Sequence, residues 1–302
     1  MRVGVLLVNY NGKQYNDICI KSILGSKAGF EIHVYIVDNA STDDSLAFLK
    51  RSWGDNSKVH ILEADENGGF AAGNNIAVRE AATDGCEYII LLNNDTHIKP
   101  DTLSQLVECS REHGRCVTVP KILYDDEKDV IWYAGGRFSS VVGKAIHAGM
   151  NQTDDGRYDQ EQTTEFATGC CICFPRKILD RLGEMDESYF LYYEDTEYSL
   201  RMKEYGIRIR YCPKAVVYHR VSASTKGSEN PMCAYYIARN WLRCNLKYLR
   251  GGRKILFLIY FVMNRTVWCL IWLIQGKRAC VTKTIEGIRD FRAGRWRQGG
   301  EQ

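Results

Sequence analysis

The sequence predicts an α/β protein in which helices flank a mainly parallel sheet and a helical extension follows at the C-terminus. Short apolar runs rich in β-branched residues alternate with helix-like segments through the first hundred residues, which is typical of strands joined by crossover helices. At 302 residues, with 45% hydrophobic and 25% charged side chains, the chain has the composition of a globular protein with a sizeable core.

The first half is expected to alternate between strand and helix. The expected strands are 3–8, 32–37, 58–62 and 88–92. The expected helices are 14–25, a helix capped by Ser41 or Thr42 with Asp43 and Asp44 in its first turn, 70–82, and 101–113.

The second half has a different pattern. Residues 130–175 contain β-rich segments with several glycines, interrupted by a polar loop at 151–164. Helical periodicity returns at 176–182 and 194–205, a strand-like run follows at 207–219, and the rest of the chain is predicted to be helical.

The net charge of +3 conceals an asymmetry along the chain. From Arg239 onward there are 14 Lys and Arg against 3 Asp and Glu, whereas the first 238 residues contain 26 against 34. An acidic body therefore carries a basic tail, which predicts an anionic surface as the partner of the tail.

The twelve cysteines do not form the pattern of a disulfide framework. Their spacings are irregular, and the single CxxC spacing, between Cys170 and Cys173 of "CCIC" (170–173), lies in an apolar, strand-like run. Since the N-terminus "MRVGVLLVNYNG" has no signal peptide, we expect reduced thiols in a cytoplasmic protein. A zinc site made by Cys170, Cys171 and Cys173 is the alternative, but the ligand spacing fits it poorly.

Polar residues follow each of the four predicted strands of the first half. These clusters are Asn9-Tyr10-Asn11-Gly12, Asp38-Asn39-Ala40-Ser41, Asn67-Gly68-Gly69 and Asn93-Asn94-Asp95. Because the carboxyl ends of parallel strands share one edge of a sheet, and ligands bind at that edge, the clusters predict a binding site.

The residue types in these clusters suit a nucleotide that carries a diphosphate. Asp38 and Asn39 can pair with the edge of a pyrimidine base, with a helix cap as the alternative for Asp38. The glycines and backbone N–H groups of "NGGFAAGNN" (67–75) suit a ribose or phosphates. Asp95 can hold Mg²⁺ or Mn²⁺, which prefer oxygen ligands, or it can cap the helix expected near residue 100.

Acidic residues and a histidine in the second half suit catalysis. Glu194, Asp195 and Glu197 fall in the first turn of a predicted helix, where they suit a general base with a neighbour that tunes its pKa. Their favourable interaction with the helix dipole is the alternative explanation. His219 ends a predicted strand and is either a metal ligand or a structural histidine.

The ordered series "NYNG", "VDNASTDDS", "ENGGFAAGNN", "LLNNDT", "ATGCC", "FLYYEDTEYSLR" and "YH" resembles the family-2 glycosyltransferases with the GT-A fold. The resemblance is closest to their bacterial rhamnosyltransferase-like branch and spans roughly residues 2–225. It implies an inverting transfer from a nucleoside-diphosphate sugar, dTDP-rhamnose or a UDP-sugar, to a lipid-linked or polysaccharide acceptor in bacterial surface glycan synthesis. It also implies a catalytic domain at 1–225, with a nucleotide-binding half at 1–98 and an acceptor-binding half at 99–225, before the extension at 226–302.

The resemblance carries roles to individual positions. The donor-binding residues that it implies are Asn9, Asn11, Asp38, Asn39, Asn67, Gly68, Asn74 and Asn94. The metal ligands would be Asp95 and His219, with Asn93 where a DxD motif has its first aspartate. The implied catalytic base is Asp195, with Glu194 beside it. The implied acceptor-binding residues are Gly169, Cys170 and Glu197.

The tail contains a long apolar segment with basic flanks. Two apolar runs, 255–263 and 267–274, flank Asn264-Arg265-Thr266 and together reach about 20 residues, the length of a bilayer crossing. A central arginine would cost roughly 2.5–3.5 kcal/mol in a bilayer. We therefore expect 250–297 to lie on the inner face of the cell membrane, with a homo-oligomer contact or a true span as alternatives.

A preceding amphipathic helix is expected at 235–249, with Arg239 and Asn240 as candidates for reaching the donor diphosphate. A nucleic-acid partner is not expected, because the apolar residues of the tail exceed what phosphate binding requires. Two rival functions remain: a sugar nucleotidyltransferase, and a catalytically inactive scaffold subunit at the membrane. The first would have a basic, glycine-rich loop after the first strand, where this chain has "NYNGKQY".

Overall fold

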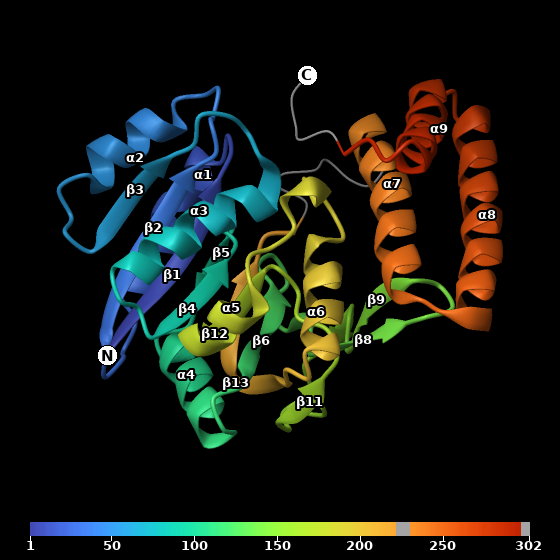
Figure 1. Ribbon diagram of the computed structural model, residues 1–302. Helices are drawn as coiled ribbons and strands as arrows, with labels where there is room; N and C mark the ends of the chain where they lie inside the picture. Colours follow the sequence, from blue (N-terminus) through green and yellow to red (C-terminus); the bar gives the residue numbers. More distant parts are fainter. Residues whose placement is uncertain (222–229, 297–302) are drawn as a thin grey trace.

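The computed structural model describes residues 1–221 and 230–296. The first half alternates strand and helix as the sequence predicts, and helices flank the sheet (Figure 1). Its strands are β1 (Arg2–Asn9), β2 (Glu31–Asp38), β3 (Val59–Glu63), β4 (Tyr88–Leu92) and β5 (Thr96–Ile98). Its helices are α1 (Lys13–Leu24), α2 (Ser45–Trp53), α3 (Gly69–Thr83) and α4 (Thr102–Glu112).

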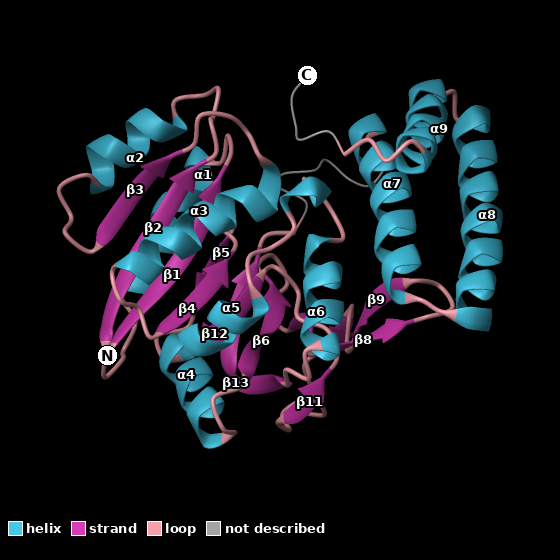
Figure 2. Cartoon of the chain, in the orientation of Figure 1, coloured by secondary structure: helices cyan, strands magenta, loops and turns pink. Residues whose placement is uncertain are grey.

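The second half adds short strands and then helices (Figure 2). Its strands are β6 (Val117–Tyr124), β7 (Val130–Tyr133), β8 (Gly136–Ser139), β9 (Lys144–His147), β10 (Gln152–Thr153), β11 (Gln162–Thr164), β12 (Cys171–Pro175) and β13 (Ile209–His219). Its helices are α5 (Arg176–Leu182), a short 3₁₀ turn at Glu187–Tyr189, α6 (Glu194–Glu204), α7 (Pro231–Tyr248), α8 (Gly251–Ile274) and α9 (Arg278–Arg292).

Within the described residues, eleven strands form one mixed sheet whose main path runs β10-β7-β6-β12-β4-β1-β2-β3. Strands β4, β1, β2 and β3 are parallel, and β1, β2 and β4 are buried along most of their length, as expected for strands covered on both faces. β12 runs antiparallel to β4 and β6, while β6 and β13 are parallel to each other. The carboxyl ends of β1, β2 and β4 therefore meet at one edge, as the sequence predicts.

Two local predictions are wrong. α2 begins at Ser45, without a side-chain cap, because Ser41 and Thr42 are bonded to the end of β1 through Asn9 and Asn11. Asp95 is also not a cap, because β5 intervenes and α4 begins at Thr102. β5 has three residues and pairs with β13, more than a hundred residues away, so the local sequence has no strong signal for it.

The C-terminal helices α7, α8 and α9 stand together beside the sheet (Figure 1). α7 begins four residues before the expected helix at 235–249, because Asn230 accepts a hydrogen bond from the Met232 N–H and Pro231 occupies the first turn. The predicted domain boundary at 225/226 lies outside the described residues, as does residue 297 at the end of the predicted membrane segment.

Candidate active site

A chain of buried amides joins the ends of β1, β2 and β4. Asn9 and Asp38 are paired across the sheet, and Asn9 Nδ2 donates to Asp38 Oδ1 at 2.8 Å. Asn16 of α1 donates to Asn9 Oδ1, and Asn94 Nδ2 donates to Asn16 Oδ1, both at 2.8 Å. The predicted donor residues at these strand ends therefore belong to one hydrogen-bonded network.

Asp38 faces into this network. It is 1% exposed, and its second carboxylate oxygen accepts the Ser41 N–H at 3.0 Å. Asp38 does not cap a helix, which was the alternative considered for it. It stabilises the turn formed by residues 38–41. Asn11 also stabilises this loop, because its Oδ1 accepts the Thr42 N–H at 2.8 Å.

Asn39 connects the end of β2 to the glycine turn before α3. Its Nδ2 donates to Asn67 Oδ1 at 2.9 Å, and its Oδ1 accepts the Gly68 N–H at 3.3 Å. Gly69 has a positive φ of 82°, and a Cβ there would collide with the backbone of Phe190. Only glycine fits this close approach, which joins the turn to the segment preceding the acidic cluster.

Asn74 lies on α3, beyond the glycine turn. It is 2% exposed, donates to the Phe70 carbonyl of its own helix at 2.9 Å, and lines a cavity of about 240 Å³ with Val78 and Leu179. Its amide is therefore engaged with the first turn of α3, and its binding of the ribose or phosphates stays a prediction.

Asp95 and His219, 124 residues apart, lie together. The pairing of β5 with β13 places His219 opposite Thr96, and His219 Nε2 is 3.2 Å from Asp95 Oδ1. Their side chains are 10% and 9% exposed. Within the described residues, Asp95 Oδ1 and His219 Nδ1 are buried without a hydrogen-bond partner. A carboxylate and an imidazole with unsatisfied buried atoms fit a divalent cation such as Mg²⁺ or Mn²⁺.

A backbone turn links this pair to the acidic cluster at the start of α6. The Gly169 N–H donates to Asp195 Oδ2 at 3.2 Å, and the Cys170 carbonyl accepts the Asn93 N–H at 2.9 Å. Gly169 is thus a neighbour of the predicted base. The Cys170 thiol is 3% exposed, and burial raises its pKa well above the ordinary value. The expectation that residues 169–170 border the acceptor stays a prediction.

Glu194 and Asp195 have strongly perturbed acidities. Burial, followed by the charge of Asp195, raises the pKa of Glu194 to about 8, and Glu194 Oε2 has no hydrogen-bond partner among the described residues. Burial also raises the pKa of Asp195, while hydrogen bonds from the Gly169 N–H and Thr196 and the proximity of His147 oppose the rise. Near pH 7 Glu194 is therefore protonated, and it lies beside a second carboxyl, Asp195, whose pKa burial also raises.

Glu197 is not an acceptor-binding residue. It is 0% exposed and forms ion pairs with Arg201 Nη2 at 3.0 Å and Lys247 Nζ at 2.7 Å. It also accepts a hydrogen bond from the Tyr248 hydroxyl at 2.6 Å. Lys247 and Tyr248 belong to α7, so the carboxylate of Glu197 joins α6 to α7.

Arg239 and Asn240 also contact protein rather than the donor. Both are fully buried in α7. Arg239 donates to the Ser188 carbonyl at 2.8 Å, and Asn240 donates to the carbonyls of Tyr189, Leu191 and Tyr192 at 2.7–2.9 Å.

These bonds hold the loop that leads into the acidic cluster. Phe190, Tyr192 and Tyr193 have positive φ values of 51–73°, a conformation that is strained for side chains with a Cβ. The hydrogen bonds from α7 offset this strain, so α7 contributes to the position of Glu194 and Asp195.

Sequence reasoning missed Asn16, Trp132 and His147. His147 lies near both Asp195 and His219, burial lowers its pKa, and its Nδ1 is 3.0 Å from the Trp132 carbonyl. The Trp132 ring contacts the rings of His147 and His219 edge-on, both at 4.7 Å between centroids. These residues lie outside the polar clusters that follow the strands. Their residue types were the only signal in the sequence that could have identified them.

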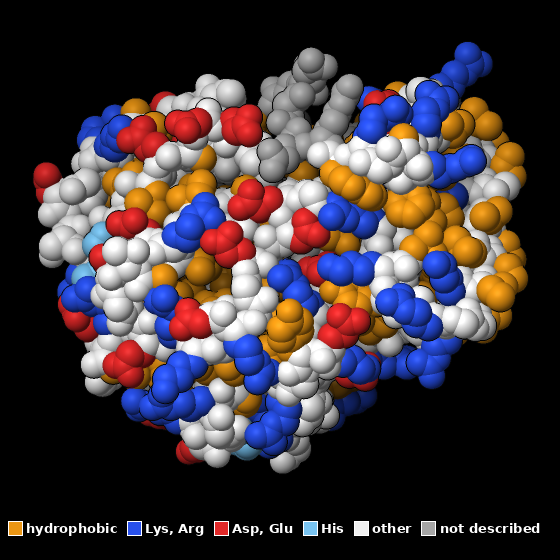
Figure 3. All heavy atoms as spheres, viewed as in Figure 1, with side chains coloured by type: hydrophobic (Ala, Val, Ile, Leu, Met, Phe, Trp, Pro, Cys, Tyr) orange, Lys and Arg blue, Asp and Glu red, His pale blue; other side chains and the backbone are white. Residues whose placement is uncertain are grey.

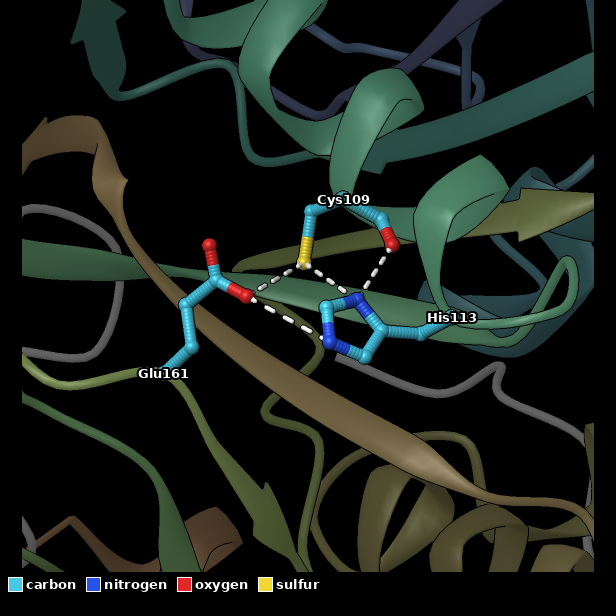
Figure 4. Close-up of side chains that lie close together, drawn as sticks. All are labelled: Cys109, His113 and Glu161. Carbon is cyan, nitrogen blue, oxygen red and sulfur yellow. Dashed lines mark hydrogen bonds and ion pairs between the residues drawn. The ribbon is translucent and has the colours of Figure 1, made fainter.

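A second group of metal-type ligands lies at the other edge of the sheet (Figure 4). Glu161 Oε2 is 3.8 Å from Cys109 Sγ and 3.7 Å from His113 Nε2, while His113 Nδ1 is 2.9 Å from the Cys109 carbonyl. Contact with Cys212 and burial raise the pKa of the Cys109 thiol. Because α4 leads into the amino end of β6, this group is remote from Asp95, and Arg210 already pairs with Glu161 at 3.9 Å.

All twelve cysteines lie within the described residues and are free thiols, as expected. The predicted alternative of a zinc site at Cys170, Cys171 and Cys173 has no support, because these side chains belong to the buried core. Alternation along β12 directs successive side chains to opposite faces of the sheet.

The chain is similar to proteins that are named as sugar transferases. The chain is 24% identical over 302 residues to the dTDP-rhamnosyl transferase RfbF of Shigella flexneri, covering 97% of each protein. It is 23% identical to the low-salt glycan biosynthesis hexosyltransferase Agl10 of Haloferax volcanii, covering 79% of this chain and 73% of that protein.

Among solved structures, the mannosyltransferase PcManGT of Pyrobaculum calidifontis, in complex with GDP-Man and Mn²⁺, superposes with a TM-score of 0.59. The match has 16% sequence identity and covers 96% of this chain and 75% of the other. The fold is thus the predicted GT-A fold. The sequence model of "Glycosyl transferase family 2" matches residues 5–183, more than half of the chain. The chain belongs to glycosyl transferase family 2 and is a glycosyltransferase.

Proposed function

We propose that this glycosyltransferase transfers a sugar, with inversion, from dTDP-rhamnose or a UDP-sugar to a lipid-linked or polysaccharide acceptor in bacterial surface glycan synthesis. The observation that carries the proposal is the 169–170 turn. Through Gly169 it bonds the proposed base Asp195, and through Cys170 it bonds Asn93 of the proposed metal motif. The similarity to the dTDP-rhamnosyl transferase RfbF along nearly the whole chain supports the rhamnose donor.

The donor would lie along the strand-end network. Asn9, Asn11, Asp38, Asn39, Asn67, Gly68 and Asn94 form its floor and hold the loops that surround the nucleotide. Asp95 and His219 would hold Mg²⁺ or Mn²⁺ beside the diphosphate. When bound, such a cation stabilises negative charge on the leaving diphosphate.

Asp195 would act as the general base. Its Oδ2 is oriented by the Gly169 N–H, and Oδ1 accepts from Thr196 Oγ1 at 3.2 Å. It takes the proton of the acceptor hydroxyl, whose oxygen attacks the anomeric carbon as the bond to the diphosphate breaks. One displacement of this kind inverts the anomeric configuration. Glu194 is protonated near pH 7, so it adds no negative charge beside Asp195.

Asp195→Asn tests this assignment. The variant keeps size and polarity but cannot take the proton, so transfer should fall by roughly 10²–10⁴-fold, the scale of general-base catalysis. Donor binding, measured by calorimetry, should stay nearly unchanged. Asp55→Asn, at an exposed position before β3, is the matched control. Transfer near the wild-type rate in Asp195→Asn would remove Asp195 from the role of base.

We also propose that the tail attaches the protein to the inner face of the cell membrane. One face of α8 is apolar and 50–87% exposed, and the residues that form it are Ile255, Leu256, Ile259, Val262, Met263, Val267, Leu270, Leu273 and Ile274. Figure 3 shows hydrophobic side chains gathered over α8 with Lys and Arg beside them. We call these nine residues the apolar face of α8.

Within the described residues, α8 is the one helix long and apolar enough to span a bilayer. Its other face packs against the protein through Phe257, Phe261, Arg265 and Trp272, which favours a helix lying on the membrane over a span. A second copy of the chain is the alternative occupant of the apolar face.

The inactive-scaffold function is the second candidate. Two features favour an active enzyme, because both cost stability in a protein that does no chemistry. One is the buried contact between Asp95 and His219, and the other is the pair of carboxyls with raised pKa at Glu194 and Asp195. A donor-hydrolysis assay separates the two, because a scaffold would release no nucleoside diphosphate.

A further inference from the structure

Two cations from different elements converge on one indole ring. Lys144 begins β9, and its Nζ lies 4.5 Å from the centroid of Trp241 in α7. Arg265 lies on the packed face of α8, with its guanidinium carbon 5.2 Å from the same centroid. Trp241 itself is fully buried, and its Nε1 donates to the carbonyl of Gly143 at 2.8 Å, which fixes the β8–β9 hairpin against α7.

Neither cation has an acidic partner within the described residues. Arg265 is 8% exposed, and within the described residues it donates hydrogen bonds to Asn264 Oδ1 alone, at 2.6 and 3.2 Å. Lys144 forms no ion pair within 4.0 Å in the described part of the chain. Other buried cations differ: Lys121, 3% exposed, contacts the carboxylates of Asp154 and Asp159.

The convergence of Lys144 and Arg265 is unfavourable without an anion. Burial lowers the pKa of both groups, and the charge of Arg265 lowers that of Lys144 further. The ring of Trp241 offsets part of this cost, since cation–π contacts contribute about 0.5–2 kcal/mol. The rest of the cost would be offset by a ligand that carries negative charge.

The position of this pair connects the active site with the apolar face of α8. Tyr193, two residues before Asp195, packs against the cluster of Trp241, Phe257 and Phe261. The strand that begins at Lys144 ends at His147, which lies near Asp195. The helix that provides Arg265 turns its opposite face outward as the apolar face. An anion bound here would therefore lie between the proposed base and the proposed membrane contact.

We propose that Lys144 and Arg265 bind the phosphate or diphosphate that joins the acceptor sugar to an apolar chain. This inference rests on the proposed function and specifies its acceptor as a phosphorylated lipid rather than a soluble polysaccharide. The two cations bind the phosphoryl oxygens, Trp241 holds both cations in place, and the apolar chain continues along α8. A guanidinium and an ammonium on one site suit the several oxygens of a diphosphate.

The test measures binding of geranyl diphosphate, a soluble isoprenyl diphosphate, to the full chain by calorimetry in EDTA. EDTA removes the divalent cation from Asp95 and His219, so the donor site contributes little to diphosphate binding. Lys144→Gln and Arg265→Gln should each weaken binding at least tenfold, as expected when a charge-assisted contact is lost. Arg265→Lys should retain most of the affinity. Lys283→Gln is the control and should bind like wild type. Lys283 also lies over an aromatic ring, that of Tyr235, but it forms an ion pair with Glu286.

Stability without ligand gives a second measurement. If the two cations are held for a ligand, Lys144→Gln relieves repulsion and leaves the unfolding midpoint unchanged or higher. A lowered midpoint in both Gln variants together with wild-type binding of geranyl diphosphate would show that the cations are structural, and would overturn the inference.

Two further arms separate this inference from its neighbours. Vesicles of phosphatidylglycerol test bulk headgroups: if the Gln variants lose vesicle binding but keep geranyl diphosphate, the anion is a bulk lipid headgroup and the acceptor assignment is overturned. Transfer by Asp195→Asn tests the proposed function separately. If Asp195→Asn abolishes transfer while both Gln variants bind geranyl diphosphate normally, only the anion site fails.

Discussion

Glu194→Gln should make the protein relatively more stable as the pH rises. Burial and the charge of Asp195 raise the pKa of Glu194 from 4.5 to about 8 in the folded state. Between these values the folded state retains a proton that the unfolded state has lost. The unfolding free energy of wild type therefore falls as the pH rises, because the folded state must either ionise a buried carboxyl or hold a proton that the unfolded state releases. A glutamine at this position cannot ionise and is free of this penalty.

The magnitude follows from the pKa shift. One proton corresponds to about 1.4 kcal/mol per pH unit, so a shift of about 3.5 units corresponds to roughly 5 kcal/mol in total. Of this, roughly 2–3 kcal/mol develops between pH 6 and pH 8. Comparing the variant with wild type cancels the titration of the other groups, so the difference in unfolding free energy isolates Glu194.

Urea denaturation of wild type and Glu194→Gln at pH 6, 7 and 8 measures this difference. The variant should gain roughly 2–3 kcal/mol relative to wild type over that range, while Glu80→Gln, on an exposed face of α3, should run parallel to wild type. Since Asp195 contributes to the shift, the gain should be smaller in an Asp195→Asn background. Parallel curves for wild type and Glu194→Gln would show that Glu194 ionises normally and would refute its description as the protonated member of the pair.

Three other changes test the remaining interpretations. Asp95→Ala should abolish the Mn²⁺-dependent part of dTDP or UDP binding in calorimetry, and equal affinities with and without Mn²⁺ in wild type would exclude the metal site. Glu197→Gln should lower the unfolding free energy by about 1.5–3 kcal/mol, because the fully buried carboxylate loses its charge-assisted bonds to Arg201 and Lys247, whereas Glu165→Gln, in an exposed pair, should cost about 1 kcal/mol or less. Ile259→Glu should weaken binding to phosphatidylglycerol vesicles in a pelleting assay, because burial worth roughly 1.5–3 kcal/mol is lost, whereas Ile18→Glu on α1 is the control. Pelleting of Ile259→Glu equal to that of wild type would argue against membrane contact through α8.

The strands, most helices and the shared edge of polar strand ends could be predicted from the sequence, because each depends on local periodicity and on the fixed direction of parallel strands. Residues that come directly after a strand, such as Asn9 and Asp38, are carried to the edge by the sheet itself. For these residues a local motif is enough to predict their place.

Side chains on helices were harder to assign. Glu197 lies two residues after Asp195, yet its carboxylate pairs with Arg201 and with Lys247 of α7, whereas Asp195 accepts the Gly169 N–H. A helix rotates by about 100° per residue, so neighbours in sequence face different partners, and the packing of distant elements selects the face. Arg239 and Asn240 were misassigned for the same reason: α7 directs them to the carbonyls of residues 188–192.

By itself, the sequence determined the α/β order, the family, and the identity of Asp95, His219, Glu194 and Asp195 as candidates for chemistry, since these follow from residue types at strand and helix ends. Only the tertiary structure brought Asp95 and His219 to 3.2 Å, turned Arg265 toward Trp241 and left the apolar face of α8 outward. The physical reason is that long-range packing, through the pairing of β5 with β13 and the contacts among α7, α8 and α9, decides which side of each element is buried.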